Sequence, residues 1–114
     1  DFLEQQNCDK KVVIATQPKS YRKKQSKLYP LEKVILRKYP AVVKKLATKA
    51  EDYNAVLDQM VKDEAADQAF IIRPPFPLEI GTLETDKKEM RRVYEVGRVE
   101  AEKVLPALRE YLNK

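Results

Sequence analysis

Two short apolar segments stand out in the pattern of hydrophobic and polar positions. The first, Lys11–Gln17 (KVVIATQ), is rich in β-branched residues, and the second, Ala69–Arg73 (AFIIR), opens with four apolar residues. Apolar runs of this length between polar and proline-rich boundaries are typical of buried strands. Pro18 follows the first run and Pro74 the second, and proline has no N–H to donate to a sheet. We therefore predict strands at Lys11–Thr16 and Ala69–Arg73.

The rest of the chain follows a helical period. Apolar residues at three- and four-residue spacing predict a helix from Pro40 to about Ala66. A shorter helix is expected at Leu31–Tyr39, because Pro30 suits the first position of a helix. A long helix should follow Asp86. Its predicted buried face comprises Met90, Val93, Tyr94, Gly97, Ala101, Val104, Leu105, Leu108, Tyr111 and Leu112.

Four residues of this last helix carry specific expectations. Asp86 is a suitable N-cap, and Glu89 would complete a capping box with it. Gly97 costs a helix about 1 kcal/mol relative to alanine, so we expect it to allow a close approach of two backbones. Pro106 should kink or restart the helix, because an interior proline costs about 3 kcal/mol.

The order of elements predicts the fold class. Two apolar strands joined by a helical crossover favour a right-handed, parallel βαβ arrangement. We predict a single α/β domain over residues 1–114, of βαβα order, with a two-helix crossover and a long C-terminal helix. The parallel sheet should be incomplete, because two strands leave two open edges. Residues 1–7 are typical of the end of a helix, so we expect a piece of a longer chain. The alternative is a natural N-terminus after processing.

Composition limits the chemistry that this chain can perform. No apolar run approaches the roughly 18 residues of a membrane span, and no signal peptide opens the chain, so we expect a cytoplasmic location. Cys8 is the only cysteine and there is no histidine, so the sequence predicts no disulfide, zinc site, histidine general base or cofactor. The GxSxG, Walker and dinucleotide motifs are absent as well, and Ser20 and Ser26 have no histidine to activate them.

The charge of the chain is unevenly distributed. Residues 1–9 carry three acids and no Lys or Arg, whereas residues 10–49 carry thirteen Lys and Arg against Glu32 alone. Residues 50–114 carry ten Lys and Arg against fourteen acids. The local balances are therefore −3, +12 and −4, within a net charge of +5. The chain is polarised more than it is basic.

Five cations in the loop after the first strand are the candidate contact residues: Lys19, Arg22, Lys23, Lys24 and Lys27. This basic loop either solubilises the chain or meets an anionic surface, which is a lipid headgroup layer or an acidic protein face. Tyr21 and Tyr29 are available as interfacial anchors. Nucleic acid is not expected, because no known binding module or base-stacking platform is evident. Arg73, where the second strand ends, is either a ligand clamp or, as we expect, half of an internal ion pair with a helix carboxylate.

Several motifs in this order resemble the C-terminal part of bacterial patatin-like phospholipases. They are VVIATQPKSYRKK, LRKYP, EDYN, AFIIRPPFPLEIGTLETDKKEM and VYEVGRVEAE. In that family a hydrophobic strand ends in Thr-x-Pro, and Tyr-Arg-Lys-Lys, Arg-Lys-Tyr-Pro, Tyr-Asn, Ile-Arg-Pro and a Tyr-x-x-Gly helix follow. The resemblance covers roughly residues 8–103, and its specificity lies in the order and spacing of the motifs.

The resemblance implies a parent hydrolase with a Ser–Asp dyad in an α/β sheet and a glycine-rich oxyanion hole. Both dyad motifs lie upstream of the matched region, so no catalytic residue is carried over to this chain. The chain would then be the noncatalytic C-terminal portion, and its partner would be the upstream catalytic portion of the same polypeptide. Peripheral contact with anionic lipid and pairing of two isolated copies are further expectations. The alternative is a free-standing interaction module that binds an acidic protein or an anionic surface through its basic loop.

Overall fold

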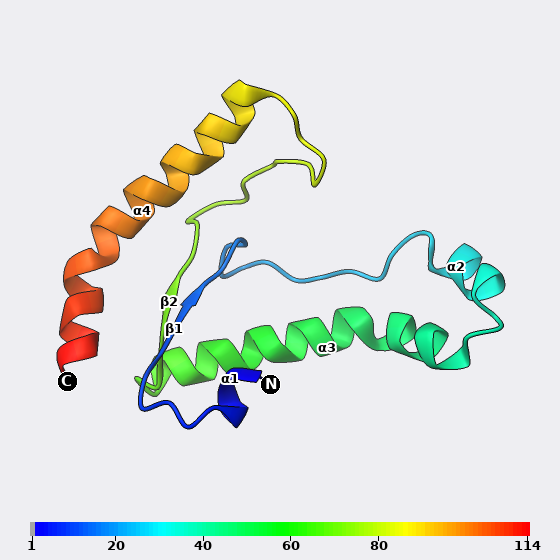
Figure 1. Ribbon diagram of the computed structural model, residues 1–114, viewed down its shortest axis with the longest axis horizontal. Coiled ribbons are helices and arrows are strands. Elements are labelled where there is room, and N and C mark those ends of the chain that lie inside the picture. The colour runs from blue at the N-terminus through cyan, green and yellow to red at the C-terminus, as the bar shows by residue number, and fades with distance from the viewer. Residues whose placement is uncertain (1) are drawn as a thin grey trace. The chain divides into compact units, whose positions relative to one another are not determined.

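The structure is a computed structural model that describes residues 2–114, so the start of the chain at Asp1 lies outside the described residues. The predicted order of elements is confirmed: strand, two helices, strand and long helix, preceded by a short helix (Figure 1). In chain order these are α1 (Phe2–Gln5), β1 (Lys11–Ile14), α2 (Tyr29–Ile35), α3 (Pro40–Ala65), β2 (Ala69–Ile72) and α4 (Lys87–Asn113). Within the described range, no helix combines the length and the apolar character that a membrane span requires.

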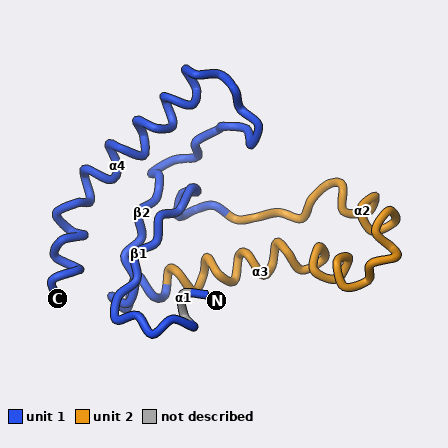
Figure 2. The backbone as a smooth tube through the Cα atoms, viewed as in Figure 1, with its two compact units in different colours: residues 1–21, 62–114 blue, residues 22–61 orange. Residues whose placement is uncertain are grey.

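The described chain divides into two compact units (Figure 2). Unit 1 contains the residues up to Tyr21 and those from Lys62 onward, which include both strands and α4. Unit 2 contains Arg22–Val61, which include α2 and most of α3.

The two strands of unit 1 pair in parallel, as predicted (Figure 1). Lys11 lies opposite Ala69 and Ile14 opposite Ile72. The ladder ends earlier than the predicted Thr16 and Arg73. The N–H of Ala15 still donates to the carbonyl of Ile72 at 2.8 Å, but Pro74 has no N–H with which to continue the pairing.

Helix α4 is joined to the sheet through Tyr111, the one buried residue of that helix. Its ring lies 5.7 Å from that of Phe70 on β2, and its hydroxyl lies 3.3 Å from both the N and the O of Lys11 on β1. The ammonium of Lys10 donates to the carbonyls of Leu112 and Lys114, each at 2.7 Å. A cation at this position satisfies free carbonyls and complements the dipole at the C-terminal end of the helix.

The predicted buried face of α4 is wrong for most of its length. Tyr94 is 65% exposed, and Met90, Leu105 and Leu112 are exposed as well. The reason is geometric: strands of four residues span about 13 Å, whereas a helix of 27 residues spans about 40 Å. A sheet of this size covers only a fraction of the apolar stripe that the helix carries.

The structure also tests the four expectations for single residues of α4. The cap is confirmed, because the carboxylate of Asp86 accepts the N–H of Lys88 at 2.8 Å. The capping box is wrong: the N–H of Asp86 donates to Glu84 at 2.9 Å, and Glu89 pairs instead with Arg92 at 2.8 Å. The close approach at Gly97 is also wrong, since a Cβ there would meet no atom within 4 Å. The helix continues through Pro106 without restarting.

In unit 2 the short helix ends earlier than predicted. Helix α2 ends at Ile35 rather than Tyr39, and Pro30 lies in its first turn. The carbonyl of Tyr39 accepts the N–H groups of Val42 and Val43, each at 3.1 Å, so Tyr39 begins α3 rather than ending α2. Helix α3 then runs from Pro40 to Ala65, within one residue of the expected end.

Candidate functional site

The part of the basic loop that lies in unit 2, from Arg22 onward, is held on α3 by the side chain of Asn54. The amide oxygen of Asn54 accepts the N–H of Lys23 at 2.7 Å, and its amide nitrogen donates to the carbonyl of Lys23 at 2.9 Å. The ammonium of Lys23 lies 4.9 Å from the ring centre of Tyr53, within the range of a cation–π interaction. The SYRKK and EDYN segments therefore meet in space, which their separation in the sequence did not reveal.

The five candidate cations have different environments. Lys19 faces Glu64 at 3.9 Å, Arg22 pairs with Asp58 at 2.9 Å, and Lys23 is engaged by Tyr53. Lys24 and Lys27 are exposed, and neither has an ion pair among the residues that the structure describes. The charge that this loop offers to a partner therefore comes mainly from Lys24 and Lys27.

The proposed aromatic anchors are not the exposed residues of this region. Tyr21 and Tyr29 are both half-buried. The large exposed side chains follow instead on α2 and its N-cap: Leu28, Leu31, Val34 and Ile35. Their spacing along the sequence was the available signal, but it resembles an ordinary core-facing helix.

Arg73 forms the expected internal ion pair. Its guanidinium lies 2.5 Å from the carboxylate of Glu64, in the last turn of α3. The side chain of Arg73 is largely buried, and a buried charge is tolerated when it is paired and hydrogen-bonded. This pair fixes the point at which the chain leaves β2.

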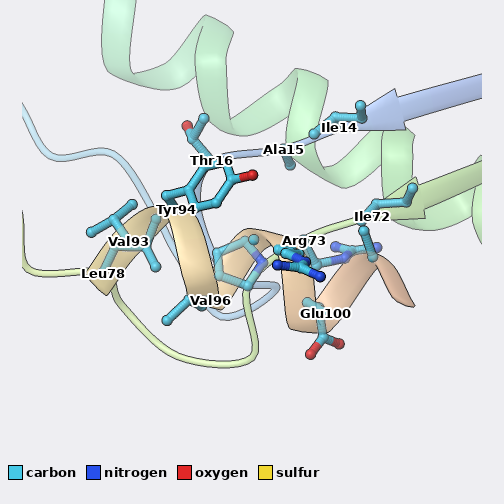
Figure 3. Close-up of a pocket in the computed structure, with 14 residues that line it drawn as sticks. Ile14, Ala15, Thr16, Ile72, Arg73, Leu78, Val93, Tyr94, Val96 and Glu100 are labelled. Carbon is cyan, nitrogen blue, oxygen red and sulfur yellow. The ribbon is translucent and has the colours of Figure 1, made fainter. Parts of the chain in front are cut away.

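A cavity of about 540 Å³ opens in unit 1 where both strands end (Figure 3). The strand ends supply Ile14, Ala15, Thr16, Ile72, Arg73 and Pro74, and the other walls are Leu78, Val93, Tyr94, Val96, Gly97, Arg98, Glu100 and Ala101. The carboxyl ends of parallel strands are the usual place for a ligand in open α/β sheets. Gly97 contributes to this wall, and its missing side chain leaves the cavity open.

The lining of the cavity favours binding over catalysis. Most of its wall is aliphatic, and its most buried charged group, Arg73, is already paired with Glu64. Neither serine of the basic loop lines it, and the sequence has no histidine to activate a hydroxyl. In the part of the chain that is described, no cluster of His, Cys, Asp and Glu is suited to a metal ion. The cavity can accept apolar groups.

One protein-family model matches the part of the chain that supplies most of the cavity wall. A family model described as Domain of unknown function (DUF6363) matches residues 39–113. The chain belongs to the DUF6363 family. No curated protein and no solved structure matches it. The DUF6363 segment contains α3, β2 and α4, and with them Asn54, Arg73 and the α4 wall of the cavity. The basic loop and β1 lie before it.

Proposed function

We propose that this chain is the noncatalytic C-terminal portion of a bacterial patatin-like acyl-ester hydrolase, in which β1 and β2 complete the sheet of an upstream catalytic portion. The observation that supports this is the two-stranded parallel sheet itself. Parallel sheets are normally buried on both faces, and so small a sheet is marginal alone. Ile14 is nevertheless 77% exposed. An adjoining strand and layer would cover it.

The exposed apolar residues of unit 1 support the same proposal. Tyr94 and Met90 on α4 and Leu83 in the preceding loop are solvent-exposed, and the cavity at the strand ends is lined by aliphatic side chains. Apolar exposure on this scale marks a contact surface. In the proposed enzyme this surface packs against the catalytic portion.

Catalysis would then belong to the upstream portion. The resemblance assigns the serine nucleophile and its aspartate partner to that portion, and this chain contributes packing to it. The parent would be cytoplasmic and would meet membranes only peripherally. Removed from its partner, the chain would pair with a second copy of itself, which sedimentation velocity would detect.

A second candidate function is contact with an anionic surface through the basic loop. Lys24 and Lys27 favour it, because they are exposed and have no ion pair among the described residues. A lipid headgroup layer suits a lipid hydrolase. An acidic protein face would instead make the chain an interaction module that needs no parent enzyme.

The reading frame tests the first proposal. The codons preceding Asp1 should encode a GxSxG motif followed by an Asp-Gly motif. A start codon within a few codons of Asp1 would contradict the proposal.

An esterase assay tests the assignment of catalysis. The isolated chain should not hydrolyse short-chain nitrophenyl esters above the uncatalysed rate, whereas the longer polypeptide should. Turnover by the isolated chain that disappears in Ser20→Ala or Ser26→Ala would show that the chain is itself an enzyme.

A further inference from the structure

Helix α2 turns its apolar residues toward solvent. Leu28 is 61% exposed, Leu31 56%, Val34 62% and Ile35 66%. At their three-, four- and seven-residue spacing these positions form one stripe, which we call the α2 stripe. Tyr29, on the other side of the helix, is half-buried, and so is Glu32, which borders the stripe beside Leu28 and Ile35. A helix that exposes leucines and partly covers a glutamate has a binding surface rather than a core-facing one.

Cations surround the α2 stripe. Lys24 and Lys27 precede it in the sequence, Arg37 and Lys38 follow it, and all four are exposed. Lys33 is exposed as well, but it is two residues from both Leu31 and Ile35 and therefore lies on the opposite side of the helix. Glu32 is the only acid between residues 10 and 49. An apolar stripe with a positive rim is complementary to a bilayer that carries anionic headgroups.

We propose that the α2 stripe inserts into the interfacial layer of an anionic membrane, while the surrounding cations contact its lipid phosphates. A protein partner is less suitable, because lysine is depleted at protein–protein interfaces. The inference rests on the anionic-surface part of the proposed function, and it deepens that part by assigning the membrane contact to α2. Tyr21 and Tyr29 have no part in it. The contact is peripheral, since α2 has only seven residues.

Vesicle co-sedimentation can measure the apolar and the electrostatic contributions to membrane binding separately. The chain should bind vesicles of phosphatidylcholine with phosphatidylglycerol, and should bind pure phosphatidylcholine far more weakly. Leu31→Ser/Ile35→Ser keeps every charge and should weaken binding at least about tenfold, because insertion scales with buried apolar area. Phe76→Ser is the control: Phe76 is an exposed apolar residue of unit 1, 48% exposed and outside the α2 stripe, so its loss should leave vesicle binding unchanged.

Charge reversal tests the positive rim. Lys24→Glu/Lys27→Glu should also weaken binding at least about tenfold, and raising salt from about 0.1 M to about 1 M should do the same by screening. Lys87→Glu/Lys88→Glu makes an equal change of net charge on α4 and should leave most of the binding intact.

A fluorescent label reports insertion directly. Cys8 is the only cysteine, so Cys8→Ser/Ile35→Cys allows one environment-sensitive dye to be placed on the stripe. Its emission should shift to the blue with anionic vesicles, whereas a dye in Cys8→Ser/Phe76→Cys, in unit 1, should not shift.

The outcomes distinguish insertion of the α2 stripe from the simpler proposal that the basic loop contacts an anionic surface. Binding that charge reversal abolishes but the serine variant retains would overturn insertion and leave electrostatic contact standing. No binding to either vesicle would overturn both. Binding by this chain but not by the longer polypeptide would show that protein covers the stripe, which also overturns the inference. None of these results bears on completion of the sheet, which the reading frame tests separately.

Discussion

The side chain of Asn54 on α3 binds the backbone of the basic loop in the way that a strand pairs with its neighbour. It presents one acceptor and one donor to the N–H and the carbonyl of Lys23. Both bonds are partly buried, so water does not fully replace either when it is lost. The order of the loop therefore depends on a residue 31 positions away.

Removing this side chain should release the loop. We expect Asn54→Ala to lower the free energy of unfolding by about 1 kcal/mol and to speed amide exchange around Lys23. Glu51→Ala, an exposed change on the same helix, is the control and should alter neither. Hydrogen–deuterium exchange with mass spectrometry measures the effect. Unchanged exchange at Lys23 in Asn54→Ala would show that the loop is held by other contacts.

Glu79 has a left-handed backbone, with φ of 52°, although glutamate has no preference for that region. We expect Glu79→Gly to stabilise the chain by up to about 1 kcal/mol, because the strain relieved exceeds the entropy that glycine loses on folding. Glu95→Gly, in the middle of α4, should instead destabilise it by about 1 kcal/mol. Chemical denaturation compares the two. A loss of stability in Glu79→Gly as large as in Glu95→Gly would contradict the assigned conformation.

The pKa of Lys114 is raised above its usual 10.5, mainly by a hydrogen bond to Asp67 and then by the charge of that carboxylate. A raised pKa means that the folded state holds the proton more tightly. The pair therefore stabilises the fold below pH 10.5, as long as the Asp67 carboxylate is ionised, and loses its effect as pH rises above 10.5.

An NMR titration of the Lys114 side chain should give a midpoint above 10.5. Asp67→Asn should lower that midpoint, and Glu110→Gln should lower it less, because Glu110 contributes less to the shift. Equal effects of the two substitutions would contradict the pairing with Asp67.

At the scale of elements, Tyr111 determines whether α4 stays on the sheet. Its hydroxyl forms hydrogen bonds with the backbone N–H and the carbonyl oxygen of Lys11, and its ring packs on Phe70. Tyr111→Phe removes only the hydroxyl and should cost about 1 kcal/mol. Tyr94→Phe, the same change at an exposed site on the same helix, should cost almost nothing. Thermal unfolding of both variants tests this. Equal melting temperatures would show that the hydroxyl of Tyr111 does not stabilise the packing of α4 on the sheet.

The elements were predictable where local chemistry decides them. Pro40 and Asp86 indicate where α3 and α4 begin. The apolar runs that start at Lys11 and Ala69 indicate the strands. Their parallel pairing followed from the crossover. The contact of Asn54 with Lys23 was not predictable, because a polar residue in a helix gives no sign of the loop that it binds.

The same limit applies to burial. A stripe of apolar residues shows that a helix has something to cover, but not what covers it. The stripe of α4 was expected to be buried, yet Tyr94 is exposed, because the sheet beneath the helix has only two strands. In α2 the apolar side faces solvent altogether. Sequence periodicity located the stripe of α4 and failed to predict its exposure, whereas for α2 only the helix was expected and not its apolar side.

At the scale of the whole molecule, very little apolar surface is fully buried. Among the described residues, the buried hydrophobic side chains other than prolines are Ala50, Ala69, Ile71 and Tyr111. Three of them are in unit 1 around the sheet, and Ala50 lies in unit 2. Chains of this length normally bury a larger core. The proposed upstream portion would supply the apolar contacts that this small core lacks.

Amide exchange of the two strands is the most direct test of that central claim. It would be measured by mass spectrometry on peptides covering Lys11–Ile14 and Ala69–Ile72, in the isolated chain and in the longer polypeptide. If the chain completes a larger sheet, the strands should exchange at least about tenfold more slowly in the longer polypeptide, because a further strand and layer shield them. Equal exchange in both proteins would contradict the account.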